Sequence, residues 1–279
     1  MANLQVLRKR YKSIQATADM ASAMKTAATV KYARISRDLT SINAYSRACD
    51  DALALFGNSA LARTSETAEK RNCITVLSNN RGFCGGFNSE LLRFFEAKMA
   101  EETEKPLLIV HGQKAMAVCR TKGWEFEELA LSDIPSYQEA ESLTARLYEI
   151  YVSGQADRIM MVYQRFDNMM TQVPVMETIL PRVRESETEE KKELLFLPDL
   201  ETAQKDPAMY CLTNSIYRLL LSHCAGAQAA TTIAMRSACD NAEKSLEKLE
   251  TLINRIRQAE VTNSVIETSS FLAGQYMEK

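Results

Sequence analysis

The chain has 279 residues, of which 46% are hydrophobic and 25% charged, so it can bury the core of one large or two modest domains. Its apolar runs are shorter than the roughly 20 residues of a membrane span, and residues 1–10 are too polar for a signal peptide. The seven cysteines form no CxxC pair and there are only two histidines. We therefore expect reduced thiols in a cytoplasmic protein, without a zinc site.

The charge of the chain is unevenly distributed. Residues 1–58 hold nine Lys/Arg and four Asp/Glu, a balance of +5, and residues 208–279 hold seven of each. Because the net charge is −2, the middle of the chain carries −7. A basic N-terminal helix is compatible with a nucleic-acid arm or with a helix that contacts acidic protein loops. It lacks the surface aromatics and basic density of such arms, so we predict a protein partner and no nucleic acid.

Residues 1–58 predict one long helix with an apolar seam. No glycine or proline precedes Gly57, and the helix would be about 80 Å long. Steps of three and four from Leu4 give sixteen positions, of which all but Lys25 and Ser46 are apolar or aromatic. These positions are Leu4, Leu7, Tyr11, Ile14, Ala18, Ala21, Lys25, Ala28, Tyr32, Ile35, Leu39, Ile42, Ser46, Cys49, Leu53 and Phe56.

Residues 207–279 predict a second long helix, roughly 100 Å long, with Asp206 as N-cap and Pro207 at its first position. Its seam comprises Ala238, Ala242, Ser245, Leu249, Leu252, Ile256, Ala259 and Ile266. We expect the two terminal helices to pair as an antiparallel coiled coil within one chain, since both adjoin the same middle segment. The alternative is that each seam dimerises with another chain.

The middle, residues 72–200, alternates strand and helix patterns with short connections. This order predicts a Rossmann-like α/β domain with a mainly parallel sheet, and an overall α+β or α/β fold class. Ser136 and Glu139 form a capping box before one of its helices. The expected strands are 73–78, 107–112, 124–129, 157–166 and 171–181, and the expected helices are 88–102, 113–122 and 136–154. Residues 182–193 predict a mobile loop, and 194–198 a short apolar run.

A glycine-rich turn follows the first of these strands. Its pattern, Gly82-x-x-Gly85-Gly86, is neither a dinucleotide fingerprint nor a P-loop. We therefore predict a tight structural turn with positive φ, and no cofactor. Cys84 as a nucleophile would need His111 or His223 as its base, and a buried inert thiol is favoured. The residues alone favour an interaction protein over an enzyme.

Five segments resemble the gamma subunit of F-type ATP synthases, in the family's order and over almost the whole chain. Two are specific: Arg81 to Asn88 (RGFCGGFN) is similar to that family's RG-LCGGLN loop, and 254–262 (NRIRQAEVT) to its YN-ARQA-IT motif. The other three are Ala23-Met24-Lys25, Thr171 to Pro174, and 228–242.

The resemblance implies a central-stalk rotor that couples ion flow through a membrane ring to ATP synthesis or hydrolysis. Its partners would be the alpha and beta subunits of the hexamer, epsilon and the membrane c-ring, at the cytoplasmic face of the cell membrane as a peripheral subunit. This chain would hold no catalytic site. The implied hexamer contacts are Arg257, Gln258, Arg8, Lys9, Lys12, Met24 and Lys25, and the implied structural loop residues are Arg81, Gly82, Cys84, Gly85, Gly86 and Asn88.

Three features depart from the family pattern and indicate a divergent member. Ser264 stands where the family has a glutamate, Leu197 stands where an acidic residue commonly precedes a proline, and the chain is mildly acidic. The alternative interpretation is a coiled-coil α/β protein that binds a nucleotide or a signalling partner. Co-purification with alpha and beta subunits would favour the rotor.

Overall fold

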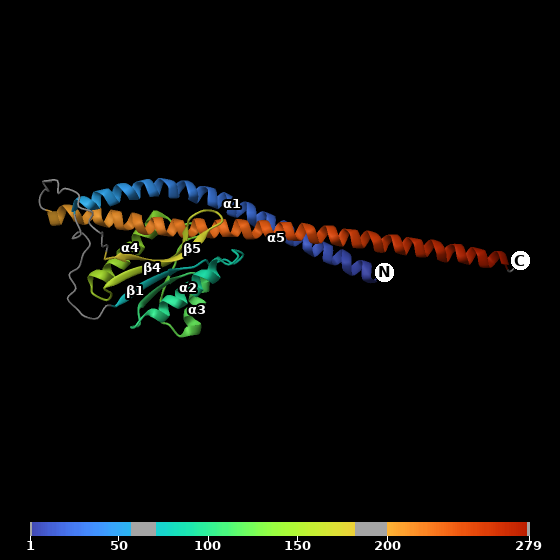
Figure 1. Cartoon of the computed structure of the whole chain (residues 1–279), viewed down its shortest axis with the longest axis horizontal. Coiled ribbons are helices and arrows are strands. Elements are labelled where there is room, and N and C mark those ends of the chain that lie inside the picture. Colours follow the sequence, from blue (N-terminus) through green and yellow to red (C-terminus); the bar gives the residue numbers. More distant parts are fainter. Residues whose placement is uncertain (1, 57–70, 182–199, 278–279) are drawn as a thin grey trace. The chain divides into compact units, whose positions relative to one another are not determined.

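The computed structural model describes residues 2–56, 71–181 and 200–277 (Figure 1). The chain divides into two compact units. Unit 1 consists of Met1–Ala27 with Thr232–Lys279, and unit 2 consists of Ala28–Thr231. The two long helices, α1 (Ala2–Phe56) and α5 (Leu200–Met277), each contribute residues to both units.

Unit 2 contains a five-stranded sheet in the order β3-β2-β1-β4-β5. Neighbouring strands run parallel except β5, which pairs antiparallel with β4, so the mainly parallel sheet is confirmed. The strands are β1 (Asn72–Leu77), β2 (Leu107–His111), β3 (Glu127–Leu129), β4 (Arg158–Phe166) and β5 (Gln172–Leu180).

Three shorter helices connect the strands. They are α2 (Phe87–Glu101), α3 (Gln113–Lys122) and α4 (Tyr137–Val152). The predicted capping box of α4 is present, because the Ser136 hydroxyl accepts from the Glu139 N–H and the Glu139 carboxylate accepts from the Ser136 N–H. Gly123, with φ 70°, ends α3 in the left-handed conformation that glycine adopts without strain.

The sheet separates two buried clusters, both within unit 2. The helices α2 and α3 cover one side of the sheet (Figure 1). Their residues Leu91, Phe95 and Met116 pack against the apolar strand residues. On the other side, α4 and residues 208–220 of α5 cover the sheet, with Leu147 and Leu212 among the fully buried side chains. A parallel sheet that is covered on both faces explains why the central strands are continuous apolar runs.

The terminal helices pack together within unit 2. Ile35 of α1 is fully buried against Leu221 and Ala225 of α5. The Asn214 amide donates to the Ser46 hydroxyl at 2.7 Å, so Ser46, one of the two polar exceptions in the predicted seam, has a partner across it. Each predicted seam position of α1 whose side chain the structure describes, Leu4 to Cys49, is buried or half-buried.

Unit 1 also pairs α1 with α5, but it buries fewer side chains. Ala21, Met235 and Cys239 form its buried cluster, and the Cys239 thiol lies 3.9 Å from the Ala18 carbonyl oxygen. The predicted α5 seam is wrong at Leu252, Ala259 and Ile266, which are all exposed, Leu252 to 43% and Ile266 to 57%. In the antiparallel register set by Ala18 and Cys239, Leu252 lies opposite about residue 5 of α1, so the helix pair leaves this side chain exposed even where α1 runs beside it.

The predicted start of the second long helix at Pro207 is wrong. The helix α5 begins at Leu200 and includes Pro207. Most residues between Leu200 and Asp206 are adequate helix formers, and a proline in the second turn removes one backbone hydrogen bond. The helix therefore continues through the proline. The predictions for residues 182–198, including Leu197, lie outside the described residues.

Candidate functional site

The signature loop, residues 81–88, is organised by the side chain of Asn88. Its Oδ1 accepts from the Asn79 N–H at 3.0 Å, and its Nδ2 lies 3.5 Å from the Arg81 carbonyl oxygen and 3.4 Å from the Cys84 sulfur. The sequence predicted that α2 begins at Asn88, but the helix begins at Phe87 and Asn88 lies in its first turn. Its side chain ties the loop to the residues that follow β1.

The backbone of the loop differs from the prediction in one respect. Only Gly85 of its three glycines has a positive φ, 59°, and Phe83 adopts 64° in place of a second glycine. A phenylalanine in this conformation is an uncommon, strained choice. Its side chain is 64% exposed, so the loop holds an aromatic ring out toward solvent at some conformational cost.

Cys84 is a buried thiol in this loop. It is 3% exposed and packs with Phe87 and Ala227, and burial raises the pKa of its thiol. Its hydrogen-bonding neighbours are Asn88 and Arg81 and not a histidine, which favours the structural role. Burial lowers the pKa of His223 to about 3, so this imidazole is neutral at physiological pH.

The loop is anchored to α5 by a close approach at Gly226. A Cβ atom built there would lie 3.1 Å from the Phe87 ring and 3.2 Å from Gln172. The absence of a side chain at position 226 therefore lets helix α5, the loop and the start of β5 meet.

An ion-pair bridge connects the loop to α1 within unit 2. Asp133 accepts from Lys31 of α1 at 2.9 Å and lies 3.1 Å from the Arg81 guanidinium. The hydrogen bond and the charge of Lys31, and to a lesser extent the charge of Arg81, lower the pKa of Asp133. Arg81 is largely exposed, so the loop carries a positive charge that Asp133 only partly neutralises.

The remaining predicted contacts of unit 1 differ in exposure. Arg8, Lys9 and Lys12 are exposed on α1. Met24 is half-buried against the Ala21 cluster, and Lys25 is half-buried as well. Of this group, the basic side chains near the N-terminus are thus the ones available to a partner.

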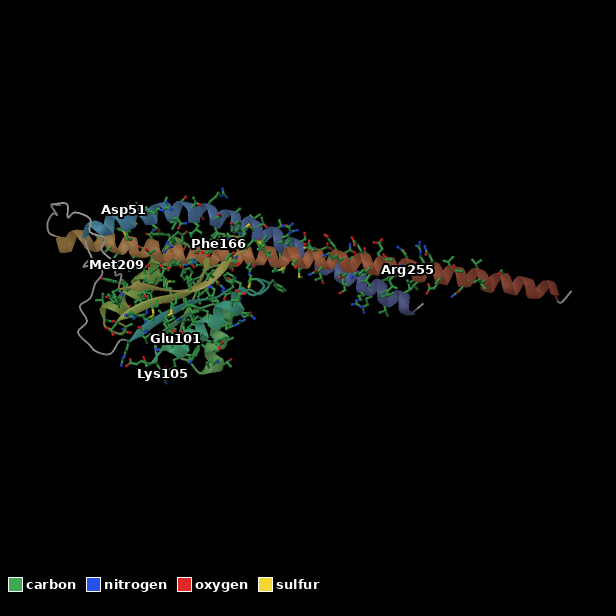
Figure 2. The ribbon with its side chains drawn as sticks, viewed as in Figure 1. Asp51, Glu101, Lys105, Phe166, Met209 and Arg255 are labelled. Carbon is green, nitrogen blue, oxygen red and sulfur yellow. The ribbon has the colours of Figure 1, made fainter. Side chains whose placement is uncertain are left out.

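Arg257 and Gln258 are both exposed on α5, as their place next to the seam residue Ile256 predicts. Arg255, labelled in Figure 2, is exposed too. This part of α5 also exposes large apolar side chains, which the sequence interpretation had assigned to a seam or left out. They are Leu252 (43%), Val261 (58%), Val265 (62%) and Ile266 (57%).

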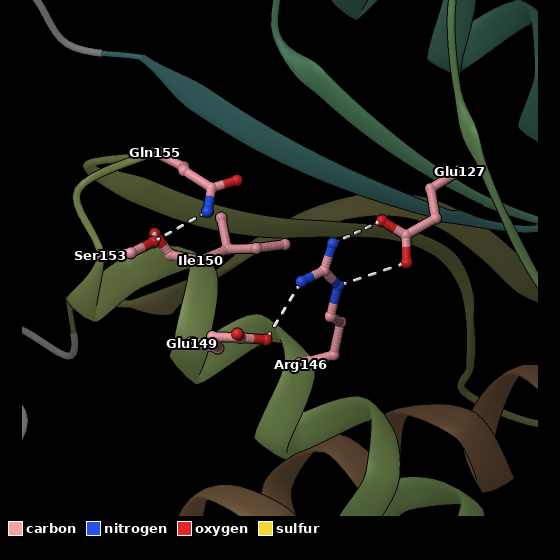
Figure 3. A network of polar contacts seen from close by, with 6 residues as sticks. All are labelled: Glu127, Arg146, Glu149, Ile150, Ser153 and Gln155. Atoms are coloured by element: carbon pink, nitrogen blue, oxygen red, sulfur yellow. Dashed lines mark hydrogen bonds and ion pairs between the residues drawn. The ribbon is translucent and has the colours of Figure 1, made fainter.

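A polar network at the edge strand β3 was missed from the sequence. The Arg146 guanidinium of α4 binds Glu127 through two nitrogens, at 3.0 and 3.3 Å, and Glu149 at 3.0 Å (Figure 3). Arg146 lines a cavity of about 370 Å³ between β3 and α4, together with Glu128 and Glu139. Only the Arg146–Glu149 spacing on one helix is visible in the sequence.

The described residues hold no cluster of three or more potential metal ligands, and none of the helices is apolar enough over those residues to cross a membrane. What the fold defines is a class of protein in which two long terminal helices pair and flank a five-stranded α/β domain. The family model for ATP synthase matches residues 3–270.

The chain belongs to the ATP synthase gamma-chain family. It is 30% identical to the ATP synthase gamma chain of Pelotomaculum thermopropionicum, with 96% of this chain and 97% of the relative covered. It is 29% identical to that of Desulforamulus reducens, with the same coverage. The predicted family is confirmed, and the signalling-protein alternative is not favoured.

Solved structures share the fold. A chain of the Euglena gracilis mitochondrial ATP synthase (OSCP/F1/c-ring, rotational state 3) matches with a TM-score of 0.69 at 17% identity, covering 100% of this chain and 96% of that one. A chain of the rotor of the same organism's enzyme matches with a TM-score of 0.63 at 18% identity, covering 93% and 99%.

Proposed function

We propose that the chain is the rotor of an F-type ATP synthase and couples ion flow through a membrane ring to ATP synthesis or hydrolysis by rotation. The observation that carries this proposal is the exposed apolar surface of α5 between Leu252 and Ile266, next to Arg257 and Gln258, in a chain of the gamma family. At 100° per residue, Val261 and Val265 lie on the opposite side of α5 from Leu252 and Ile266. Large apolar side chains exposed on more than one side of a helix favour burial against a partner that surrounds it.

The mechanism follows from asymmetry. A hexamer of alpha and beta subunits would offer three equivalent catalytic sites, whereas a single helix pair has no threefold symmetry. Each beta subunit would therefore contact a different side of the shaft, and its nucleotide affinity would change as the shaft turns. Only contacts that differ among the three orientations shift the affinities.

Specific side chains supply these contacts in the proposal. The exposed Arg257 guanidinium would form charge-assisted hydrogen bonds with a carboxylate of the hexamer, and Gln258 would both donate and accept. Arg8, Lys9 and Lys12 would face acidic loops of the beta subunits. Met24 and Lys25 would contribute through the parts of their side chains that the helix pair leaves open.

The α/β domain would serve the other partners, epsilon and the c-ring. In this assignment the loop residues Arg81 to Asn88 shape the domain and do not bind a nucleotide. The chain would hold no catalytic site or cofactor of its own and would lie at the cytoplasmic face of the membrane as a peripheral part of the complex.

Co-expression with alpha and beta subunits tests the proposal. We expect a stable complex that hydrolyses ATP, and hydrolysis that depends on this chain. Calorimetric titration of the isolated chain with ATP should show no saturable site. One ATP bound tightly per chain, together with no complex, would favour a nucleotide-binding signalling protein.

A further inference from the structure

Two buried cysteines face each other across the helix pair of unit 2. Ser46 of α1 and Asn214 of α5 are hydrogen-bonded at 2.7 Å and fix the register there. Three residues further along α1 and three residues back along α5 are Cys49 and Cys211, which the antiparallel direction places opposite each other. The Cys211 sulfur lies 3.6 Å from the Cys49 carbonyl oxygen, which confirms this register.

The surroundings of this pair suit a covalent link. A disulfide requires Cα atoms roughly 4.4–6.8 Å apart, and only closely approaching helices meet that requirement. The neighbouring layer consists of the small side chain of Ser46 with Asn214, which permits a close approach. Cys239, the cysteine in the described seam of unit 1, instead contacts Ala18 and so has an alanine across from it.

The pair lies just beneath the surface. Cys49 and Cys211 are 5% and 4% exposed, whereas Tyr45 and Tyr210 beside them are 51% and 60% exposed. Cys49 most strongly, and Cys211 to a lesser extent, raise the pKa of Tyr45, so both sulfurs lie near this exposed ring. Movement of one tyrosine side chain would admit a small oxidant.

We propose that Cys49 and Cys211 are a modification site, which a low-molecular-weight disulfide such as oxidised glutathione converts into a disulfide that joins α1 to α5. One cysteine thiolate attacks a glutathione sulfur and releases a reduced glutathione. The second cysteine, after losing its proton, attacks the mixed disulfide at the first cysteine's sulfur and releases a second glutathione. Two cysteine thiols are oxidised, and one glutathione disulfide is reduced to two thiols that take up the two protons.

The link would act on stability and is independent of the proposed rotor function. It joins positions 162 residues apart and closes a loop that contains the whole sheet. In the chain-entropy account, restraining so long a loop in the unfolded state stabilises the fold more than restraining a short one. The oxidised chain would therefore keep its helix pair closed at temperatures that separate the reduced chain.

The test uses the full chain in native buffer with oxidised glutathione, followed by peptide mapping without reductant. We expect one dominant crosslinked peptide containing Cys49 and Cys211, and a melting temperature raised by about 5–10 °C that dithiothreitol reverses. Cys49→Ser and Cys211→Ser should each abolish both effects. Cys119→Ser, a change at a buried thiol of α3, should leave both intact.

Other results would overturn the proposal. Glutathione attached to either cysteine without a crosslink would show that the pair cannot close. The proposal would also be wrong if the dominant crosslink joined other cysteines. It would be wrong as well if the crosslinked chain had the same melting temperature as Cys211→Ser. Oxidation in denaturant serves as the reference and should give mixed pairings.

Discussion

Units 1 and 2 both pair α1 with α5, yet their hydrophobic cores differ greatly in size. Unit 2 buries two large clusters on either side of a sheet, and its part of α5 is covered by α4, the sheet and α1. Among the side chains that the structure describes, unit 1 buries Ala21, Met235 and Cys239 and leaves large apolar side chains exposed on α5. Amphipathic helix sequence thus produces a stable core where other elements cover it and an available binding surface where they do not.

The largest effect is expected in the core of unit 2. Phe95 is fully buried and packs edge-on against Trp124 with ring centroids 5.6 Å apart. We expect Phe95→Ala to lower the free energy of unfolding by about 3–5 kcal/mol, because it leaves a cavity that the sheet cannot close. Phe83→Ala, at an exposed ring, is the matched control and should change it by less than about 0.5 kcal/mol. Urea unfolding followed by the fluorescence of Trp124, the chain's single tryptophan, measures both variants. Equal effects would contradict the burial pattern.

A smaller effect is expected in unit 1. Met235 is 7% exposed but belongs to a cluster of only three buried residues. Met235→Ala should destabilise the helix pair by about 2 kcal/mol, at the low end for a buried methionine. Leu252→Ala, at a 43% exposed position, should have almost no effect on the isolated chain. Amide hydrogen exchange along residues 232–260 reports both. A large loss of protection in Leu252→Ala would mean that this residue is packed in solution.

The smallest effect concerns the acid stability of unit 2. Burial alone would raise the pKa of Glu139, but hydrogen bonds from Ser136 and Ser132 outweigh it and lower the pKa from 4.5 to about 2. A carboxyl group with a lowered pKa in the folded state stabilises the fold fully above its unfolded pKa and loses that contribution as pH falls. Wild-type stability should therefore decline between about pH 4.5 and pH 2.

Glu139→Gln isolates this contribution. Gln keeps a side-chain oxygen that can accept from the Ser136 N–H but lacks the charge, so the variant should lose about 1 kcal/mol at neutral pH, and its stability should vary less across that acidic window. Glu141→Gln, at an exposed site on the same helix, is the control. Denaturation at a series of pH values gives the comparison, and parallel curves for wild type and Glu139→Gln would refute the assignment.

Local sequence rules predicted the fold well wherever neighbours in the chain decide the structure. The periodic spacing of apolar residues and the turn-forming residues predicted every strand of the sheet, and the same local rules predicted the capping box and the α1 seam. The start of α5 was missed because an Asp-Pro pair is typical of a helix N-terminus. In this helix, Pro207 lies inside, and the helix tolerates the one backbone hydrogen bond that the proline removes.

The site was harder to predict because it depends on tertiary register. The positions of Arg257 and Gln258 outside the seam followed from helical spacing. Arg146 binds Glu127 of another element, and Cys49 faces Cys211 from a helix 162 residues further along the chain. A seam pattern shows which side of each helix is apolar, but it does not show which residues meet across it.

The central claim is that the exposed surface of α5 is built for a partner that encloses it. Steady-state ATP hydrolysis by the complex reconstituted with alpha and beta subunits tests this claim most directly, using Arg257→Ala combined with Gln258→Ala. Both residues are exposed, so folding and assembly should stay at wild-type levels, whereas hydrolysis should fall markedly because contacts that differ among rotary orientations are lost. Lys248→Ala, at another exposed position on α5, is the control and should retain wild-type turnover. Wild-type turnover of the double variant, with wild-type assembly, would contradict the account.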